Sequence, residues 1–167
     1  MVTHLDPRDY TDPYLATYAF VPPAREGVCI VCHTGAPPGS PTCRSCKETM
    51  SQVSHQTELV VPITLYRIPS QMWTVLRGYK DGYSETERTA HGVRVAATIA
   101  RFLDVHRACI ESVIGEAITL VTTVPSSRGR VGVHPLERAV RRASSISDLY
   151  ASVLSRGPGE ILSLIHI

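Results

Sequence analysis

The alternation of apolar and polar positions predicts three helices after about residue 70. In the longest, over about 85–113, apolar or aromatic side chains recur at steps of three and four: Val95, Ile99, Phe102, His106, Ile110 and Val113. Ser84 and Glu87 have the spacing of a capping box at its start. Shorter helices are predicted over about 70–79 and from Pro135 to about residue 143.

Two β-rich apolar segments predict strands. The first covers residues 58–65 (ELVVPITL), where Pro62 indicates an edge position or a bulge. The second covers residues 119–124 (TLVTTV) and ends at Pro125. Strand, helix, strand, loop and helix in this order predict an α/β fold with a mainly parallel sheet, of which the chain would hold the incomplete first half.

Composition divides the chain into four segments. Residues 1–27 are rich in Pro, Asp and Tyr and predict a loosely ordered lead-in, while residues 28–50 hold a candidate zinc ribbon. The α/β domain would cover 56–161. The last six residues, 162–167 (LSLIHI), match one reading frame of a common sequencing-library transposon end. We expect this tail to be adapter-derived and the natural protein to continue, with a genuine C-terminal strand as the alternative.

The charge balance adds one feature to this picture. The net charge is only +2, and 43% of residues are hydrophobic, which predicts a packed core. Arginines nevertheless gather between residues 126 and 160, at positions 128, 130, 138, 141, 142 and 156. This basic portion fits an anionic ligand, or simply a solvated helix face. Because neither a secretory signal nor an apolar run of membrane-spanning length is visible, we expect a cytoplasmic protein with no membrane partner.

The cysteine spacing carries the most specific chemistry. Cys29, Cys32, Cys43 and Cys46 form the pattern C-x2-C-x10-C-x2-C. Each C-x-x-C can place two thiolates on one turn, and two facing turns supply four sulfurs at about 2.3 Å from Zn²⁺. A closed shell of four thiolates leaves no position for water, so the predicted zinc site is structural.

The cysteines also fit two other patterns, each less well than a zinc site. Cys29-x-x-Cys32-His33 also fits c-type haem attachment, which requires export and leaves the second pair unexplained. A thioredoxin-like redox pair would follow a strand, and a reducing compartment disfavours disulfides. Cys109 lies apart from the cluster and is expected to be a small buried side chain, while His106 on the same helix is expected to be a hydrogen-bonded or boundary residue.

Taken in order, the motifs resemble the ComF family, zinc-ribbon-bearing relatives of type I phosphoribosyltransferases that are associated in some bacteria with competence and DNA uptake. The fragments that carry the resemblance follow the cysteine pairs and are Leu65-Tyr66-Arg67, Leu76-x-x-Tyr79-Lys80 and Val124-Pro125-Ser126-Ser127-Arg128-Gly129-Arg130, then His134-Pro135-Leu136-Glu137. The last two resemble a divergent group associated with actinobacteria. The resemblance spans about residues 28–157.

The resemblance implies a phosphoribosyltransferase that binds phosphoribosyl pyrophosphate (PRPP) with Mg²⁺ and transfers the phosphoribosyl group to a nucleobase or an amine. It places the leaving pyrophosphate at a loop formed by Ser126, Ser127, Arg128, Gly129 and Arg130. Arginines offer bidentate hydrogen bonds to phosphate, and glycine lets the backbone approach. Lys80 is a further candidate for this site. The alternatives are an ordinary exposed basic loop and a solvated lysine.

The sequence departs from that family in two places. No adjacent acidic pair followed by a Thr-Thr-Gly loop occurs, and Thr122-Thr123 is followed by Val124. Gly132-Val133-His134-Pro135 also replaces the usual Gly-Phe-Asn-Gln. A truncated chain explains the first departure, and we expect the fragment as given to be inactive. The rival prediction is a non-catalytic zinc-ribbon module that binds single-stranded nucleic acid through its arginines, although only 6% of residues are aromatic.

Overall fold

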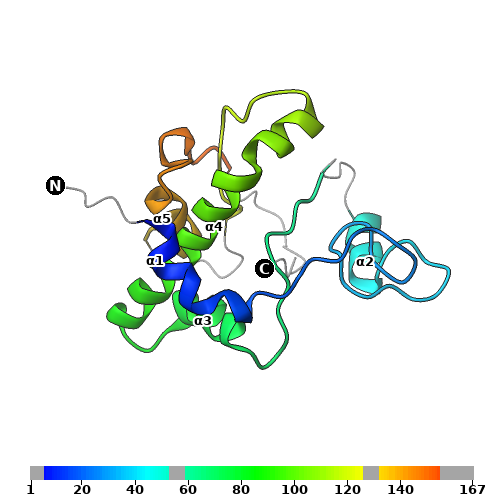
Figure 1. Cartoon of the computed structure of the whole chain (residues 1–167), viewed down its shortest axis with the longest axis horizontal. Coiled ribbons are helices and arrows are strands. Elements are labelled where there is room, and N and C mark those ends of the chain that lie inside the picture. The colour runs from blue at the N-terminus through cyan, green and yellow to red at the C-terminus, as the bar shows by residue number, and fades with distance from the viewer. Residues whose placement is uncertain (1–5, 53–58, 126–131, 155–167) are drawn as a thin grey trace. The chain divides into compact units, whose positions relative to one another are not determined.

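The computed structural model describes residues 6–52, 59–125 and 132–154. The chain divides into two compact units (Figure 1). Tyr18–Arg67 forms the first, here called the cysteine unit. Met1–Thr17 and Ile68–Ile167 together form the second, here called the helical unit.

Helix α4, Glu85–Ile114, is the central element of the helical unit (Figure 1). Its predicted start is confirmed, because Ser84 accepts a hydrogen bond from Glu87 N–H and the Glu87 carboxylate accepts one from Ser84 N–H. Gly115 ends the helix in the left-handed conformation at φ 76°. The buried residues of α4 are small or β-branched and lie between positions 92 and 100, up to the middle of the helix: Gly92, Val95, Ala96, Ala97 and Ala100.

Three shorter helices pack against α4. Helix α3, Gln71–Asp81, begins at the Ser70 cap and buries Met72, Val75 and Tyr79. Helix α5, Pro135–Arg142, begins where His134 accepts a hydrogen bond from Leu136 N–H. Both helices agree with the predicted ranges. The buried side chains of Ala100, Val140, Ala143 and Ile146 form one hydrophobic cluster of this unit.

The third is α1, Pro7–Thr11, which continues into the 3-10 helix η1, Asp12–Thr17. This segment falls within residues 1–27, which were expected to be a loosely ordered lead-in. Two arginines of α4 hold it: Arg101 donates to Thr11 Oγ1 at 2.6 Å and pairs with Asp12, and Arg94 lies over the Tyr14 ring at 4.1 Å and donates to its hydroxyl. Polar anchoring of this kind has no hydrophobic period, so sequence patterning gives no signal for it.

The predicted α/β fold with a mainly parallel sheet is wrong for the part of the chain that the structure describes. No strand forms there, and only three isolated bridges occur: Ala19–Leu65, Val28–Gly35 and Val121–Tyr150. In the predicted strand over 58–65, residues 59–64 form no backbone bridge, and Pro62 has no N–H to donate. In the other, over 119–124, only Val121 forms a bridge. Its N–H donates to the carbonyl of Leu149, the last residue of the short 3-10 helix η2, Ser147–Leu149, and its carbonyl accepts from Ala151 N–H just after that helix. Apolar β-rich residues make a strand only when a second segment supplies a continuous row of hydrogen bonds.

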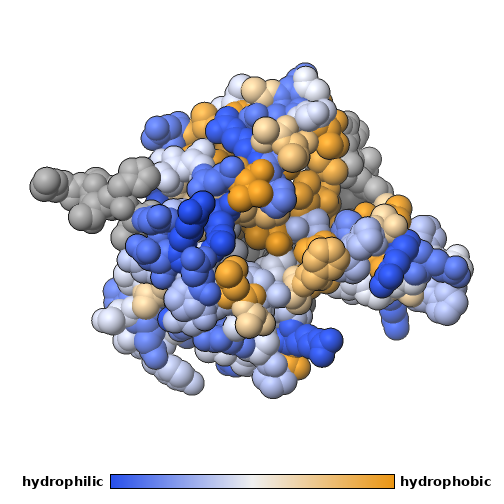
Figure 2. Space-filling model, in the orientation of Figure 1, coloured by the Kyte–Doolittle hydropathy of each residue, from blue (hydrophilic) through white to orange (hydrophobic). Residues whose placement is uncertain are grey.

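The C-terminal half of α4 is largely exposed. Val105 is 64% and Val113 is 73% exposed, and Figure 2 shows apolar side chains, in orange, on the part of the surface where Figure 1 places this half of the helix. Cys109 is exposed too, so the expectation of a small buried side chain is wrong. His106 is exposed and stacks at a tilt on Phe102, with 4.8 Å between ring centroids. None of the described helices combines the length and the apolar character that crossing a membrane would require.

Candidate metal centre

A tight turn positions the first cysteine pair of the cysteine unit. Cys29 N–H donates to the Thr34 carbonyl at 2.8 Å, and His33 N–H donates to the Cys29 carbonyl at 3.0 Å. His33 adopts a φ of 58°, the left-handed conformation, which folds the chain back so that Val28 bridges Gly35. The turn brings the thiols of Cys29 and Cys32 to one side of the backbone.

A helix start positions the second pair. Cys43 directly precedes α2, Arg44–Gln52, and Cys46 lies in the first turn of that helix. Cys46 N–H points to Cys43 Sγ at 3.5 Å. Helix N-termini carry a partial positive charge that stabilises thiolates. The insert with Pro37 and Gly39 forms a turn. The helix after it was not predicted, so the second half of the site is not a ribbon of strands.

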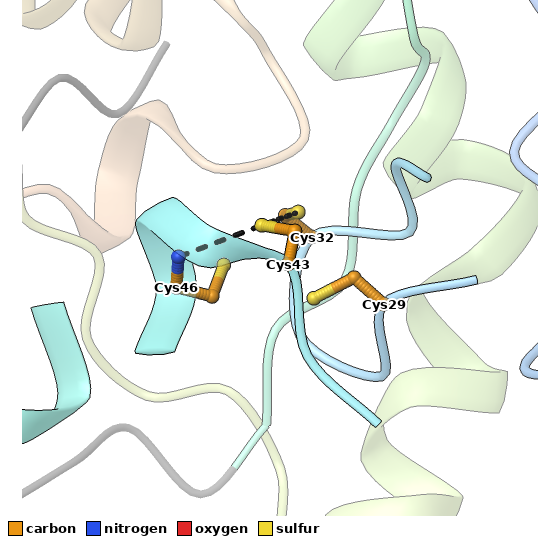
Figure 3. Close-up of side chains that lie close together, drawn as sticks. All are labelled: Cys29, Cys32, Cys43 and Cys46. Atoms are coloured by element: carbon orange, nitrogen blue, oxygen red, sulfur yellow. Dashed lines mark hydrogen bonds between the residues drawn. The ribbon is translucent and has the colours of Figure 1, made fainter. Parts of the chain in front are cut away.

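The four sulfur atoms converge, as the sequence predicts (Figure 3). All of them lie within 4.8 Å of one another, and Cys32 Sγ and Cys43 Sγ are 3.6 Å apart. Four sulfurs at about 2.3 Å from a tetrahedral zinc ion would be about 3.8 Å apart. The cysteines are free thiols, and a separation of 3.6 Å is far longer than a disulfide bond. The arrangement can therefore hold a metal such as zinc.

Burial and hydrogen bonding act differently on two of these thiols. Burial alone would raise the pKa of Cys29, but backbone N–H groups, including those of Cys32 and Cys43, outweigh it and lower that pKa to about 6. Burial raises the pKa of Cys46 well above its ordinary value, and hydrogen bonds to the other thiols raise it further. A bound metal would favour the ionised form of all four cysteines, because the thiolate and not the thiol is the metal ligand.

His33 and Thr34 lie next to the cysteines, and neither adds a metal ligand to the four sulfur atoms. His33 Nδ1 lies 2.8 Å from the Pro22 carbonyl, which occupies that ring nitrogen. Thr34 Oγ1 lies 3.0 Å from Cys32 Sγ, in a position to orient that sulfur. Across the described ranges, the four cysteines are the only group of three or more metal-ligating side chains close enough to hold an ion. Neither Thr34 nor the Pro22 carbonyl has a sequence signal that would have pointed to it.

The other predicted site residues are only partly placed. Ser126, Ser127, Arg128, Gly129 and Arg130 lie outside the described residues. Lys80 lies in the last turn of α3, and its ammonium nitrogen is 5.4 Å from the centroid of the Tyr79 ring.

Lys80 also lines a cleft of the helical unit together with three arginines that sequence analysis did not assign to a site: Arg88, Arg138 and Arg142. The arginine-rich composition of 126–160 was a signal for two of them. It could not show which arginines share a surface, because that depends on how the helices pack.

Comparison with known proteins adds no family to this description. No protein-family model matches the chain, and no match was found among the curated proteins or among the solved structures.

Proposed function

We propose that this protein binds one zinc ion through Cys29, Cys32, Cys43 and Cys46, and that the ion serves to fold the cysteine unit. The observation that carries the proposal is the convergence of four sulfur atoms within 4.8 Å. All four tetrahedral positions would be taken by sulfur, so zinc would have no open position for water or substrate. The role is structural, since catalytic zinc requires such a position.

Metal content and a matched pair of variants test this proposal. Purified protein should contain about one zinc ion per chain by elemental mass spectrometry. Cys46→Ser should lose most of that zinc, because Cys46 is only 3% exposed and lies within the cluster. Cys109→Ser should keep it, because Cys109 is exposed and outside the cluster. Equal zinc content in the two variants, or none in the wild-type protein, would contradict the proposal.

We further propose that the helical unit binds a phosphorylated small molecule of the PRPP class, as the resemblance to the ComF family implies. Two things support this: the sequence motif that ends at Lys80, and the position of Lys80 beside three arginines in one cleft. The proposal concerns ligand binding and needs no parallel sheet. Mg²⁺ would enter as its complex with PRPP, because magnesium in such sites binds the substrate phosphates and keeps several of its own waters.

Calorimetric titration of zinc-loaded protein with PRPP and Mg²⁺ tests the second proposal. Saturable binding supports it, and the absence of binding at low salt contradicts it. Single-stranded oligonucleotide is the competing ligand, since arginines also bind nucleic acid backbones. Oligonucleotide binding that weakens steeply with salt, in protein that does not bind PRPP, would favour the nucleic-acid module instead.

A further inference from the structure

A concave surface of the helical unit lies where the end of α3, the N-terminal part of α4 and the length of α5 meet. Its volume is about 360 Å³, a size that suits a small-molecule ligand. The lining residues are Tyr79, Lys80, Glu85, Arg88, Thr89, Gly92, Val133, Pro135, Arg138 and Arg142. Four of these side chains are basic and one is acidic, so the cleft carries an excess of positive charge.

The single carboxylate in this cleft is shared. Glu85 Oε2 accepts from Arg88 at 3.0 Å, and Glu85 Oε1 accepts from Arg138 at 3.2 Å. Arg88 also donates to the Gly82 carbonyl at 2.8 Å, which fixes its guanidinium beside the turn between α3 and α4. One carboxylate therefore orients two guanidinium groups, from α4 and from α5, and neutralises only one of their two charges.

Arg142 supplies a guanidinium of a different kind. It forms no ion pair with any residue that the structure describes, in contrast to its neighbour Arg141, which pairs with Glu137 at 3.0 Å. A Cβ atom built on Gly92 would lie 3.5 Å from Arg142 Nη1, so the guanidinium passes directly over the α4 backbone. Among the described residues, the cleft thus contains one arginine without a counter-ion beside two arginines that share one.

We propose that this cleft binds the phosphate or diphosphate group of the ligand, with Arg138 and Arg142 as its principal contacts and Glu85 as a competitor that the anion displaces. The inference rests on the proposed binding of a phosphorylated ligand and assigns it to residues of α4 and α5. Guanidinium groups bind phosphate through paired hydrogen bonds, and a bound anion would offset the positive excess. Glu85 keeps Arg88 and Arg138 in place until an anion arrives.

The test titrates inorganic pyrophosphate and PRPP, each with Mg²⁺, into the zinc-loaded full chain. Arg142→Gln and Arg138→Gln should each weaken binding about tenfold or more, since hydrogen bonds to charged groups contribute about 1.5–3 kcal/mol. Glu85→Gln should tighten binding several-fold, because the competing negative charge is removed. Arg141→Gln is the matched control and should change affinity less than about twofold, because Arg141 lies outside the cleft and stacks on Tyr150 at 4.5 Å. Thermal melting of each variant confirms that the helical unit is folded.

The outcomes separate the two proposals. Wild-type protein that binds neither probe contradicts the proposed function itself. Wild-type protein that binds both probes, with Arg138→Gln and Arg142→Gln binding as tightly as wild type, overturns the assignment to this cleft and leaves the proposed function standing. A loss in Arg141→Gln equal to that in Arg142→Gln also overturns it, because net charge would then explain the effect. Tighter binding by Glu85→Gln together with weaker binding by Arg142→Gln supports the cleft.

Discussion

Each of the two units of this protein is stabilised by a different kind of interaction. In the described part of the cysteine unit, the buried side chains are Val28, Thr42 and two of the cysteines. The helical unit buries the apolar faces of α3, α4 and α5, including a cluster around Ala100 and Val140. We therefore expect the cysteine unit to depend on metal coordination, whereas the helical unit depends on close packing. Small units without a core need such a substitute for hydrophobic burial.

Removal of metal should have the largest effect, and it should unfold one unit while the other stays folded. A strong chelator, or Cys46→Ser, is expected to unfold the cysteine unit, since structural zinc contributes on the order of 10 kcal/mol to folding. The helical unit should remain folded, because it contains none of the four ligands. Trp73, the only tryptophan, lies in α3 and reports on that unit. Proteolysis should cleave within 18–67 while the unfolding midpoint from Trp73 fluorescence stays unchanged.

Cys109→Ser provides the control for that experiment and should leave both readouts as in the wild-type protein. Simultaneous loss of the Trp73 transition on chelation would contradict the contrast between the two units. It would mean that the helical unit depends on the metal as well.

The close packing of the helical unit can be disrupted at Gly78 of α3. A Cβ atom there would lie 2.2 Å from His91 Cδ2 of α4, closer than any van der Waals contact allows. Gly78→Ala should therefore destabilise the helical unit by about 1–3 kcal/mol, although alanine favours helix by up to about 1 kcal/mol. The measurement is urea unfolding followed by Trp73 fluorescence, with zinc content as evidence that the cysteine unit is unaffected.

The same substitution in a His91→Ala variant tests the reason for this loss of stability. Truncation of the neighbouring ring in His91→Ala removes the atoms that would clash, so Gly78→Ala should become neutral or stabilising there. If Gly78→Ala costs the same in both backgrounds, the close approach of α3 and α4 is not the reason for glycine at this position.

A smaller effect is expected at the start of α4. Ser84→Ala removes the side-chain oxygen that accepts from Glu87 N–H, and should cost about 1 kcal/mol of helical-unit stability. Ser84→Asp keeps an acceptor at the cap and should stay close to wild type. Equal losses in the two variants would show that the capping hydrogen bond does not contribute to stability.

The smallest effect concerns pH. Hydrogen bonds from Arg107 and from Ile118 N–H lower the pKa of Glu111, near the C-terminal end of α4. A lowered folded-state pKa means that the stabilisation is present above the unfolded-state pKa of about 4.3 and is lost as pH falls through the folded-state value. Glu111→Gln should therefore be less stable than wild type near neutral pH, and the difference should shrink below about pH 4. A difference that stays constant from pH 7 into this acid range would contradict the assignment.

Sequence reasoning succeeded where local signals decide the structure. The range of α4 follows from Ser84, Glu87 and its hydrophobic period, and the start of α5 follows from Pro135. The cysteine cluster follows from spacing alone, because each C-x-x-C turn is a local structure.

Sequence reasoning failed where long-range partners decide. The segment 119–124 has strand composition but pairs only at Val121, since no neighbouring segment continues the hydrogen bonding. Cys109 was expected to be buried because it lies near the apolar stripe of α4. That stripe was assumed to be covered along its full length, and the structure covers mainly its N-terminal half.

The exposed position of Cys109 has a practical consequence for chemical labelling. The chain has five cysteines, and a zinc-loaded protein would shield four of them by coordination. A maleimide dye would then attach at a single point on α4, without any substitution in the chain. The same reagent would find five thiols after chelation, so its stoichiometry would count the metal-bound fraction directly, while the single dye would serve as a fluorescent donor for measuring distances from α4.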